Sequence, residues 1–194
     1  GASTAAVISH PGITVDQVEI SPAVIEAARH FKSINDGVLS SKRLSLHIMD
    51  AREFLALRPK ARYDIIVSEP SNPWLGGSAA LFTEEYFRDL RRHLAPGGVV
   101  VQWVQSYEFS EEMLTRVFRT FRKVYPHTSL WCAATVDLML VGSMKPLKLD
   151  VAQMRRRLRR PAVQRNLAKL KWRVDTEDVL FFLSRQVLSE KGFD

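Results

Sequence analysis

Polar side chains that suit ligand binding follow a short apolar segment at residues 63–67. This segment, YDIIV, is typical of a strand buried on both faces of a parallel sheet. Glu69, Asn72 and Trp74 come directly after it, in a loop whose two prolines fix the backbone and remove two amide donors. In an open α/β sheet, ligands bind outside the carboxyl ends of the strands. We therefore expect the acid, the amide and the indole to contribute to a ligand site.

Acids also follow two other predicted strands. Glu19 is the penultimate residue of a strand expected at 15–20, and it lies 18 residues after Gly1. In nucleotide-binding α/β units, an acid after the second strand accepts hydrogen bonds from ribose hydroxyls, and it lies ~20 residues beyond the glycine turn that precedes the first helix. The spacing between Gly1 and Glu19 is close to this value. Asp50 and Ala51 directly follow a strand expected at 44–49, at its carboxyl end, where an acid can accept a hydrogen bond from a base amino group. Asp50 equally suits the N-cap of the next helix, and the two roles are compatible.

The elements that position these residues alternate along the chain. Strands are expected at 15–20, 44–49, 63–67 and 99–104, and later at 129–132 and 136–141. Helices are expected after Ser21 and at 52–57, 83–94, 111–124 and 176–188. The last two strands are joined by a connection too short for a crossover, which makes this pair antiparallel. The pattern predicts an α/β fold with a Rossmann-like, doubly wound, mainly parallel sheet and a helical C-terminal segment.

The chain opens on a helix rather than on the apolar strand with which a nucleotide-binding α/β unit normally begins. We therefore expect the first strand of the sheet, and most of the glycine turn around Gly1, to be missing. A sheet without its first strand leaves an edge that another chain can pair with. This predicts self-association, in the simplest case as a homodimer.

Composition limits the possible classes of protein. With 194 residues and 46% hydrophobic content, the chain can bury one good-sized core. We expect residues 1–145 to form the nucleoside-binding catalytic domain and 146–194 a basic helical appendage. The single cysteine, Cys132, excludes an internal disulfide, and the five histidines lack metal-ligand spacing, so we expect no metal site. No stretch approaches the ~18 apolar residues of a membrane span, and we expect a cytoplasmic protein.

The net charge of +7 is concentrated near the C-terminus. Residues 151–174 contain nine basic side chains and no acidic ones. Such a run can contact nucleic acid phosphates. It also fits two short amphipathic helices, broken at Pro161, whose arginines and lysines face solvent while Met154, Leu158, Val163, Leu167 and Leu170 pack inward. We prefer the second interpretation and do not expect nucleic acid as a partner.

Four motifs in order resemble the spermidine synthase family of polyamine aminopropyltransferases, in particular its bacterial spermidine synthase-like branch. They read VEISPAVIEAARHF, MDAREFL, YDIIVSEPSNPW…ALFTEEYF and LAPGGVVVQWVQSY, and the resemblance covers residues 1–143. It implies the fold of class I S-adenosylmethionine-dependent methyltransferases. It also implies that decarboxylated S-adenosylmethionine is the co-substrate and that an amine is the acceptor.

The resemblance assigns roles to individual residues. The family's central loop reads Asp-Ser-Ser-Asp-Pro, where the first acid is the proposed base and the second holds the substrate amine. Glu69 falls at the first acid and Asn72 at the second. Glu19 would bind the ribose, Asp50 would face the adenine, and Gln102 would lie near the amine. Losing the second carboxylate weakens diamine binding, because a charge-assisted hydrogen bond contributes roughly 1.5–3 kcal/mol and a neutral one about 1 kcal/mol. The acceptor is therefore expected to differ from putrescine.

Two other functions remain open from the sequence. Ser71-Asn72-Pro73-Trp74 faintly resembles the Asn-Pro-Pro-Tyr motif of amino-group methyltransferases, which would use S-adenosylmethionine itself and act on an amino group, including one in nucleic acid. The second proline is absent, and the surrounding sequence follows the aminopropyltransferase pattern more closely. A third hypothesis is a non-catalytic protein that binds a nucleoside or a partner protein.

Overall fold

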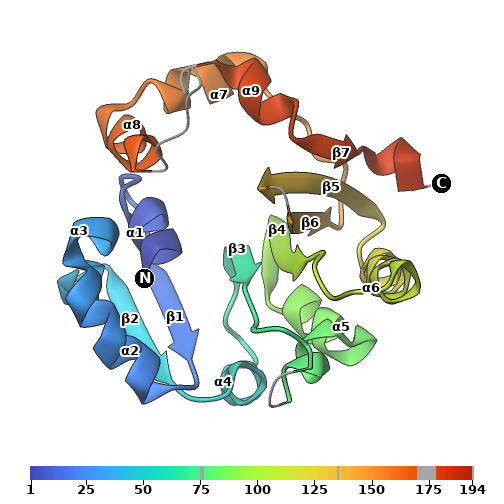
Figure 1. The fold of residues 1–194 in the computed structure, drawn as a ribbon, viewed down its shortest axis with the longest axis horizontal. Helices are drawn as coiled ribbons and strands as arrows, with labels where there is room; N and C mark the ends of the chain where they lie inside the picture. The colour runs from blue at the N-terminus through green and yellow to red at the C-terminus, as the bar shows by residue number, and fades with distance from the viewer. Residues whose placement is uncertain (75–76, 135, 170–177, 194) are drawn as a thin grey trace. The chain divides into compact units, whose positions relative to one another are not determined.

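The structure, a computed structural model, describes residues 1–74, 77–134, 136–169 and 178–193. The chain divides into two compact units (Figure 1). Unit 1 comprises Gly1–Leu57 and Leu149–Phe181, and unit 2 comprises Arg58–Lys148 and Phe182–Asp194. Residues 1–145, which we expected to form one domain, thus contribute to both units, and residues 146–194 are shared between them.

Unit 1 contains a two-stranded parallel sheet of β1 (Val15–Glu19) and β2 (Leu44–Ile48). Its helices are α1 (Ala2–Ile8), α2 (Pro22–Ala28), α3 (Lys32–Asn35), α4 (Ala51–Leu57), α7 (Val151–Leu158) and α8 (Pro161–Ala168), with 3₁₀ turns η1 (Arg29–Phe31) and η2 (Val38–Ser40). The core between α1, η2 and the sheet is a small apolar cluster of Ala5, Ile8 and Val38, with Val15 and Leu44 packed against it. Both predicted strands are confirmed to within one residue.

Unit 2 contains a five-stranded sheet of order β3-β4-β6-β5-β7. Its strands are β3 (Tyr63–Ser68), β4 (Leu94–Gln105), β5 (His127–Ala134), β6 (Asp137–Ser143) and β7 (Gln186–Leu188), and its helices are α5 (Glu84–Arg92) and α6 (Glu111–Val124), with η3 (Ser78–Phe82) and η4 (Glu190–Phe193). β3 and β4 are parallel, whereas β6 runs antiparallel to both β4 and β5. The predicted antiparallel pair is confirmed.

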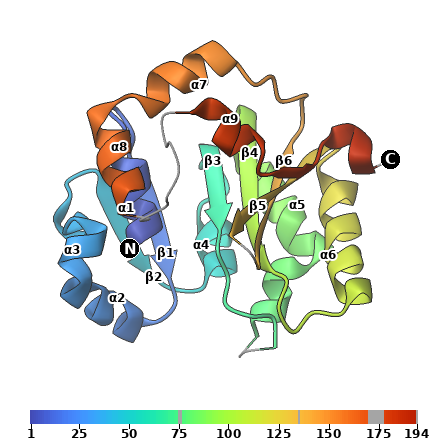
Figure 2. The same ribbon diagram turned by 45° about the horizontal axis from the view of Figure 1, so that its top comes forward.

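One face of the unit 2 sheet is covered by α5 and α6 (Figures 1 and 2). Phe87 of α5 and Phe121 and Tyr125 at the end of α6 are fully buried, and the Tyr125 hydroxyl donates to the Phe87 carbonyl at 2.8 Å. Gly142 of β6 lies beneath these rings, since an added Cβ there would be 2.6 Å from a Phe121 ring carbon. Strand alternation places alternate side chains of β4 on this same face.

The strands form two sheets among the described residues, where we expected one. β1 and β2 form one sheet in unit 1, and β3, β4, β6, β5 and β7 form the other in unit 2.

Two predicted boundaries are wrong for local reasons. The helix expected at 83–94 ends at Arg92, and the next strand begins at Leu94 rather than at residue 99. The Tyr63 amide donates to the His93 carbonyl at 2.8 Å, and the β3–β4 register then shifts before Ile65 pairs with Val99. Gly98 permits this irregularity, because a Cβ there would be 3.0 Å from the Tyr63 carbonyl oxygen.

The helix expected at 176–188 is only partly correct. Residues 176–177 lie outside the described part of the chain, and α9 covers Val179–Leu183. The following residues form β7, which pairs antiparallel with β5. A strand forms there because the edge of β5 offers backbone groups that a continuing helix would leave unpaired.

Candidate nucleoside and amine site

Glu19 lies at the carboxyl end of β1 in unit 1. It pairs with Ile48 of the parallel strand β2, and the Met49 amide donates to the Glu19 carbonyl at 3.1 Å. The Ser21 amide donates to Glu19 Oε1 at 2.9 Å, which fixes the half-buried carboxylate at the start of α2. Ser21 is the N-cap of α2, the helix expected after it, although its side chain makes no capping hydrogen bond. One carboxylate oxygen of Glu19 is thus held by the backbone.

Asp50 follows β2 at the same edge of this sheet, where its carboxylate caps α4. Asp50 Oδ1 accepts from the amides of Arg52 at 2.7 Å and Glu53 at 3.4 Å, and the Arg52 guanidinium donates to both carboxylate oxygens. The hydrogen bond from the Arg52 side chain is the main reason that the pKa of Asp50 is lowered. Ala51 is the first residue of α4, and Gly1 is the N-cap of α1. The N-cap role of Asp50 is therefore confirmed, and a base amino group would have to share the carboxylate with Arg52.

Glu69 is exposed directly after β3 in unit 2. Ser68, the last residue of β3, pairs with Gln102 of the parallel strand β4, so Glu69 follows the residue that is paired with Gln102. Gln102 is fully buried and donates to the Trp103 carbonyl at 3.1 Å. Its Oε1 is buried and has no hydrogen-bond partner among the described residues. A buried, unpaired carbonyl oxygen is costly and suits a ligand that donates a hydrogen bond.

Asn72 and Trp74 lie in the loop after β3, against the segment that follows β4. The Tyr107 hydroxyl donates to Asn72 Oδ1 at 3.0 Å. The Trp74 ring centroid lies 6.3 Å from that of Tyr107 and 5.7 Å from that of Phe109. The structure thus joins the two predicted residues Asn72 and Trp74 to an aromatic pair that we did not predict as part of a site.

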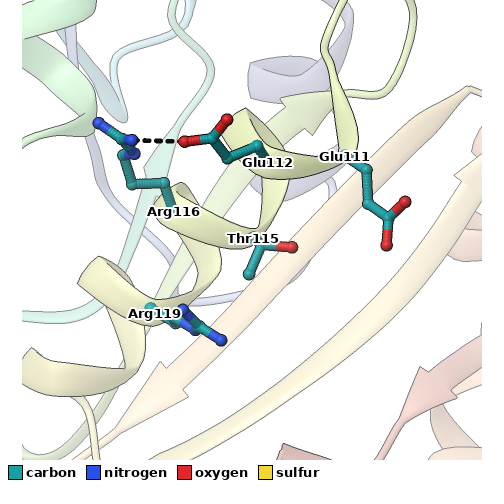
Figure 3. A pocket seen from close by; sticks show the side chains of 5 residues that line it. All are labelled: Glu111, Glu112, Thr115, Arg116 and Arg119. Atoms are coloured by element: carbon teal, nitrogen blue, oxygen red, sulfur yellow. Dashed lines mark hydrogen bonds and ion pairs between the residues drawn. The ribbon is translucent and has the colours of Figure 1, made fainter.

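Two hollows open on the surface of unit 2. One, of about 430 Å³, is lined by Glu111, Glu112, Thr115, Arg116 and Arg119 of α6 alone (Figure 3). Glu112 and Arg116 pair with each other at 2.6 Å, so their charges are already matched. The other hollow, of about 390 Å³, lies between α6 and the loop after β3. It shares Glu112 and Arg116 with the first, and its remaining walls are Pro73, Ala79, Phe82, Phe109, Met113, Val117 and Thr120. Only the second is adjacent to the predicted site residues.

The basic segment takes the amphipathic form that we preferred. Met154, Leu158, Val163 and Leu167 are half-buried, whereas the arginines of α7 and α8 are exposed; Leu170 lies outside the described residues. Lys169 contacts Asp36 at 2.5 Å and the Ile34 carbonyl at 3.1 Å. The pKa of His10 is lowered, mainly by burial and to a smaller extent by the positive charges of Arg160 and Arg157.

Neither a metal site nor a membrane span is found in the described ranges. No group of three or more histidine, cysteine or acidic side chains there could hold a metal ion. No helix there has the length and apolar character needed to cross a membrane.

Sequence reasoning missed Tyr107, Phe109 and Gln105. Gln105 is fully buried near the end of β4, and neither side-chain polar atom has a partner among the described residues. All three residues lie within a few positions of the end of a predicted strand, which is the signal that would have identified them. That rule led us to Glu19, Asp50 and the residues after β3, and we did not apply it to the residues after β4.

Comparison with known proteins identifies the relatives of this chain. Residues 1–145 match the family described as the spermine/spermidine synthase domain. A spermine synthase of Arabidopsis thaliana is 33% identical over 115 residues, which are 57% of this chain and 32% of that protein. The chain spans about a third to just under half of the length of the first curated relatives it matches.

Solved structures share the fold. A spermidine synthase in complex with the transition-state analogue AdoDATO gives a TM-score of 0.65 at 20% identity, covering 80% of this chain and 54% of that one. Human methyltransferase-like protein 13 in complex with SAH gives a TM-score of 0.65 at 24% identity, covering 92% of this chain and 81% of that one. The α/β fold of the class I methyltransferase type is therefore confirmed.

Proposed function

Because the chain belongs to the spermine/spermidine synthase domain family through residues 1–145, we propose that it binds the substrates of an aminopropyltransferase. The reaction would move an aminopropyl group from decarboxylated S-adenosylmethionine to an amine, as in polyamine biosynthesis. The main support is the placement of Glu19 and Glu69, each directly at the carboxyl end of a strand that has a parallel neighbour. This is the edge at which α/β sheets bind ligands.

In unit 1, Glu19 is the ribose-binding residue of this proposal. Its Oε1 accepts from the Ser21 amide, and Oε2 would accept from a ribose hydroxyl. Asp50 and Ala51 form the adenine side, and Gly1 belongs to the turn that approaches the cofactor. Asp50 shares its carboxylate with Arg52, which makes its contribution smaller than that of Glu19.

In unit 2, Glu69 is the general base. An alkyl amine resembles lysine, with a reference pKa of about 10.4, and must lose a proton before it can attack. Glu69 takes this proton, the amine nitrogen bonds to the carbon beside the sulfonium, and the carbon–sulfur bond breaks to release methylthioadenosine. Gln102 Oε1 accepts a hydrogen bond from the amine, which satisfies an otherwise unpaired buried oxygen. Asn72 and Trp74 bind the rest of the acceptor.

The nucleoside assignment is tested by calorimetric titration of the chain with decarboxylated S-adenosylmethionine, methylthioadenosine and S-adenosylmethionine. We expect the first two to bind more tightly than the third, and Glu19→Ala to weaken binding about tenfold, the loss of a hydrogen bond to a charged group. Glu26→Ala is the matched control, since this exposed acid of α2 pairs only with Arg29 among the described residues. Preference for S-adenosylmethionine would instead support the methyltransferase hypothesis, for which the likeness to methyltransferase-like protein 13 supplies the fold.

The base is tested by aminopropyl transfer to a panel of amines. Glu69→Gln keeps the size of the side chain but cannot accept the proton, so the transfer rate should fall by about 10²–10⁴-fold. Glu85→Gln, at an exposed acid of α5, should leave the rate unchanged. Equal rates for the two variants would exclude Glu69 as the base.

We also propose that the protein self-associates, as a homodimer in the cytoplasm. Among the described strands, β3 pairs only with β4, and its Ile65 and Val67 are 61% and 48% exposed. An apolar edge strand of this kind favours pairing with another chain. Light scattering should show a dimer that Val67→Lys converts to a monomer, and a monomeric wild-type chain at all concentrations would contradict this proposal.

A further inference from the structure

Tyr107 and Phe109, the aromatic pair after β4, have no role in the proposal above, and they form a compact group with Asn72 and Trp74 of the β3 loop. We call Asn72, Trp74, Tyr107 and Phe109 the aromatic subsite. Trp74 contacts both other rings, edge-on to Tyr107 at an interplanar angle of 76° and tilted by 58° to Phe109. Trp74 is 42% exposed and Tyr107 is 40% exposed, so each presents part of its ring to solvent.

The backbone between the two rings adopts an uncommon conformation. Glu108 has φ of 57°, in the left-handed region that residues other than glycine rarely occupy. Its two neighbours, Tyr107 and Phe109, both turn their rings to Trp74. Strained conformations of this kind persist where the surrounding contacts require them and cluster at ligand sites.

The hydrogen bond between Tyr107 and Asn72 determines what the subsite can accept. The tyrosine proton is donated to Asn72 Oδ1, so the tyrosine oxygen is left with lone pairs only. Asn72 Oδ1, which accepts this one hydrogen bond, retains a second lone pair. The subsite therefore offers two neutral acceptor atoms beside aromatic faces, and none of its four residues carries a charge.

This chemistry fits a particular kind of cation. A primary ammonium is strongly hydrated and carries three donors, so its desolvation is best compensated by a carboxylate. An N-alkylated ammonium has fewer donors, and its charge is spread over alkyl groups that contact aromatic faces favourably. We infer that the aromatic subsite binds the N-alkylated ammonium end of the acceptor, whose other end is the primary amine that reacts. This inference rests on the proposed aminopropyl transfer and names its substrate class.

The adjoining hollow supports this choice. Phe109 belongs both to the subsite and to the hollow of about 390 Å³, and Pro73 of the same hollow lies between Asn72 and Trp74 in the chain. Its other walls include Phe82, Met113 and Val117, together with Thr120 and the ion pair of Glu112 and Arg116. The apolar part of this wall gives room for alkyl substituents, which a primary ammonium lacks, and the two charges on the wall are paired with each other.

The test is calorimetric titration of the chain, with methylthioadenosine present, with putrescine, N,N-dimethylputrescine and an isostere in which CH replaces the substituted nitrogen. We expect dimethylputrescine to bind about 5- to 30-fold more tightly than its isostere, the range of a cation–π contact, and more tightly than putrescine. Trp74→Leu should abolish this preference. Phe31→Leu, which removes a ring that is 55% exposed in unit 1, should not change it.

Asn72→Asp adds the opposite prediction. A carboxylate at this position should reverse the order of the two affinities, so that putrescine binds more tightly than N,N-dimethylputrescine. Equal or tighter binding of putrescine to the wild-type chain, an unchanged preference in Trp74→Leu, or no binding of any amine would each overturn the inference. Methylthioadenosine binding and its loss in Glu19→Ala are read in the same experiments, so failure of the subsite is distinguished from failure of the proposed function.

Discussion

Gly142→Ala tests how tightly α6 packs on the sheet of unit 2. The added Cβ would lie 2.6 and 2.8 Å from two ring carbons of Phe121 and 2.8 Å from Cγ of Tyr125. Ordinary contacts begin near 3.4 Å, so the rings must move by about 0.8 Å. Both rings are fully buried, and Phe121 also contacts Phe87 at a centroid distance of 5.1 Å. The displacement must therefore pass to α6 as a whole.

The expected cost follows from these contacts. Overpacking a core costs typically about 1–3 kcal/mol, and this site belongs at the upper end because the obstructing atoms are in rigid rings. The backbone of Gly142 does not have a positive φ, so alanine recovers about 0.4–1 kcal/mol through the unfolded chain. We expect a net loss of about 2 kcal/mol in the free energy of unfolding.

Urea unfolding followed by tryptophan fluorescence measures this loss, since Trp74, Trp103 and Trp131 all belong to unit 2. Gly192→Ala is the control, because its nearest neighbour is the flexible end of Leu188 at 3.2 Å. Adding Phe121→Leu should relieve the clash. The double variant should therefore lose less unfolding free energy than the two single variants lose in sum, by at least about 1 kcal/mol. Unchanged stability of Gly142→Ala, or strict additivity, would refute this reasoning.

Three further predictions concern single buried or titrating groups. Asn35 is 2% exposed and hydrogen-bonds a carbonyl at 2.7 Å and an amide at 3.0 Å, so Asn35→Ala should lower the unfolding free energy by about 2 kcal/mol in urea titrations. Tyr125→Phe removes only the hydrogen bond to the Phe87 carbonyl and should cost about 1 kcal/mol by the same assay, much less than Gly142→Ala. The pKa of His10 is lowered in the folded chain, so the unfolded chain binds a proton more readily and stability should fall as the pH drops below about 6.5. Arg160→Gln should raise the pKa of His10 in an NMR titration, and an unmoved midpoint would show that this arginine does not act on it.

The positions of the site residues could be predicted because they depend on local rules. Glu19 and Glu69 follow short apolar strands, and such strands can be recognised from the sequence alone. Both acids lie where expected, at the carboxyl ends of β1 and β3. The extent of α6 matches the helix expected at 111–124; the structure shows Ser110 accepting from the Met113 amide at its start and Arg122 and Lys123 in its last turn.

The features that depend on distant partners could not be predicted in this way. The shift in register beside Gly98 depends on how close β3 approaches, which no local pattern records. β7 depends on the free edge of β5, and its three residues carry no strand signal of their own. The contact between Asn72 and Tyr107 joins residues 35 positions apart, so neither sequence segment indicates the other.

The order in which the two units are synthesised follows from how the chain is divided between them. Unit 1 needs Leu149–Phe181, and these residues are made only after the whole of Arg58–Lys148. At the usual translation rate of ~5–20 residues per second, on the order of ten seconds pass between the synthesis of Gly1–Leu57 and that of Leu149, where the second segment of unit 1 begins. During that interval β3 to β6, with α5 and α6, are already complete. Unit 2 also includes Phe182–Asp194, which are made after Phe181, so unit 2 receives its last segment after unit 1 does, although most of its sheet is made earlier.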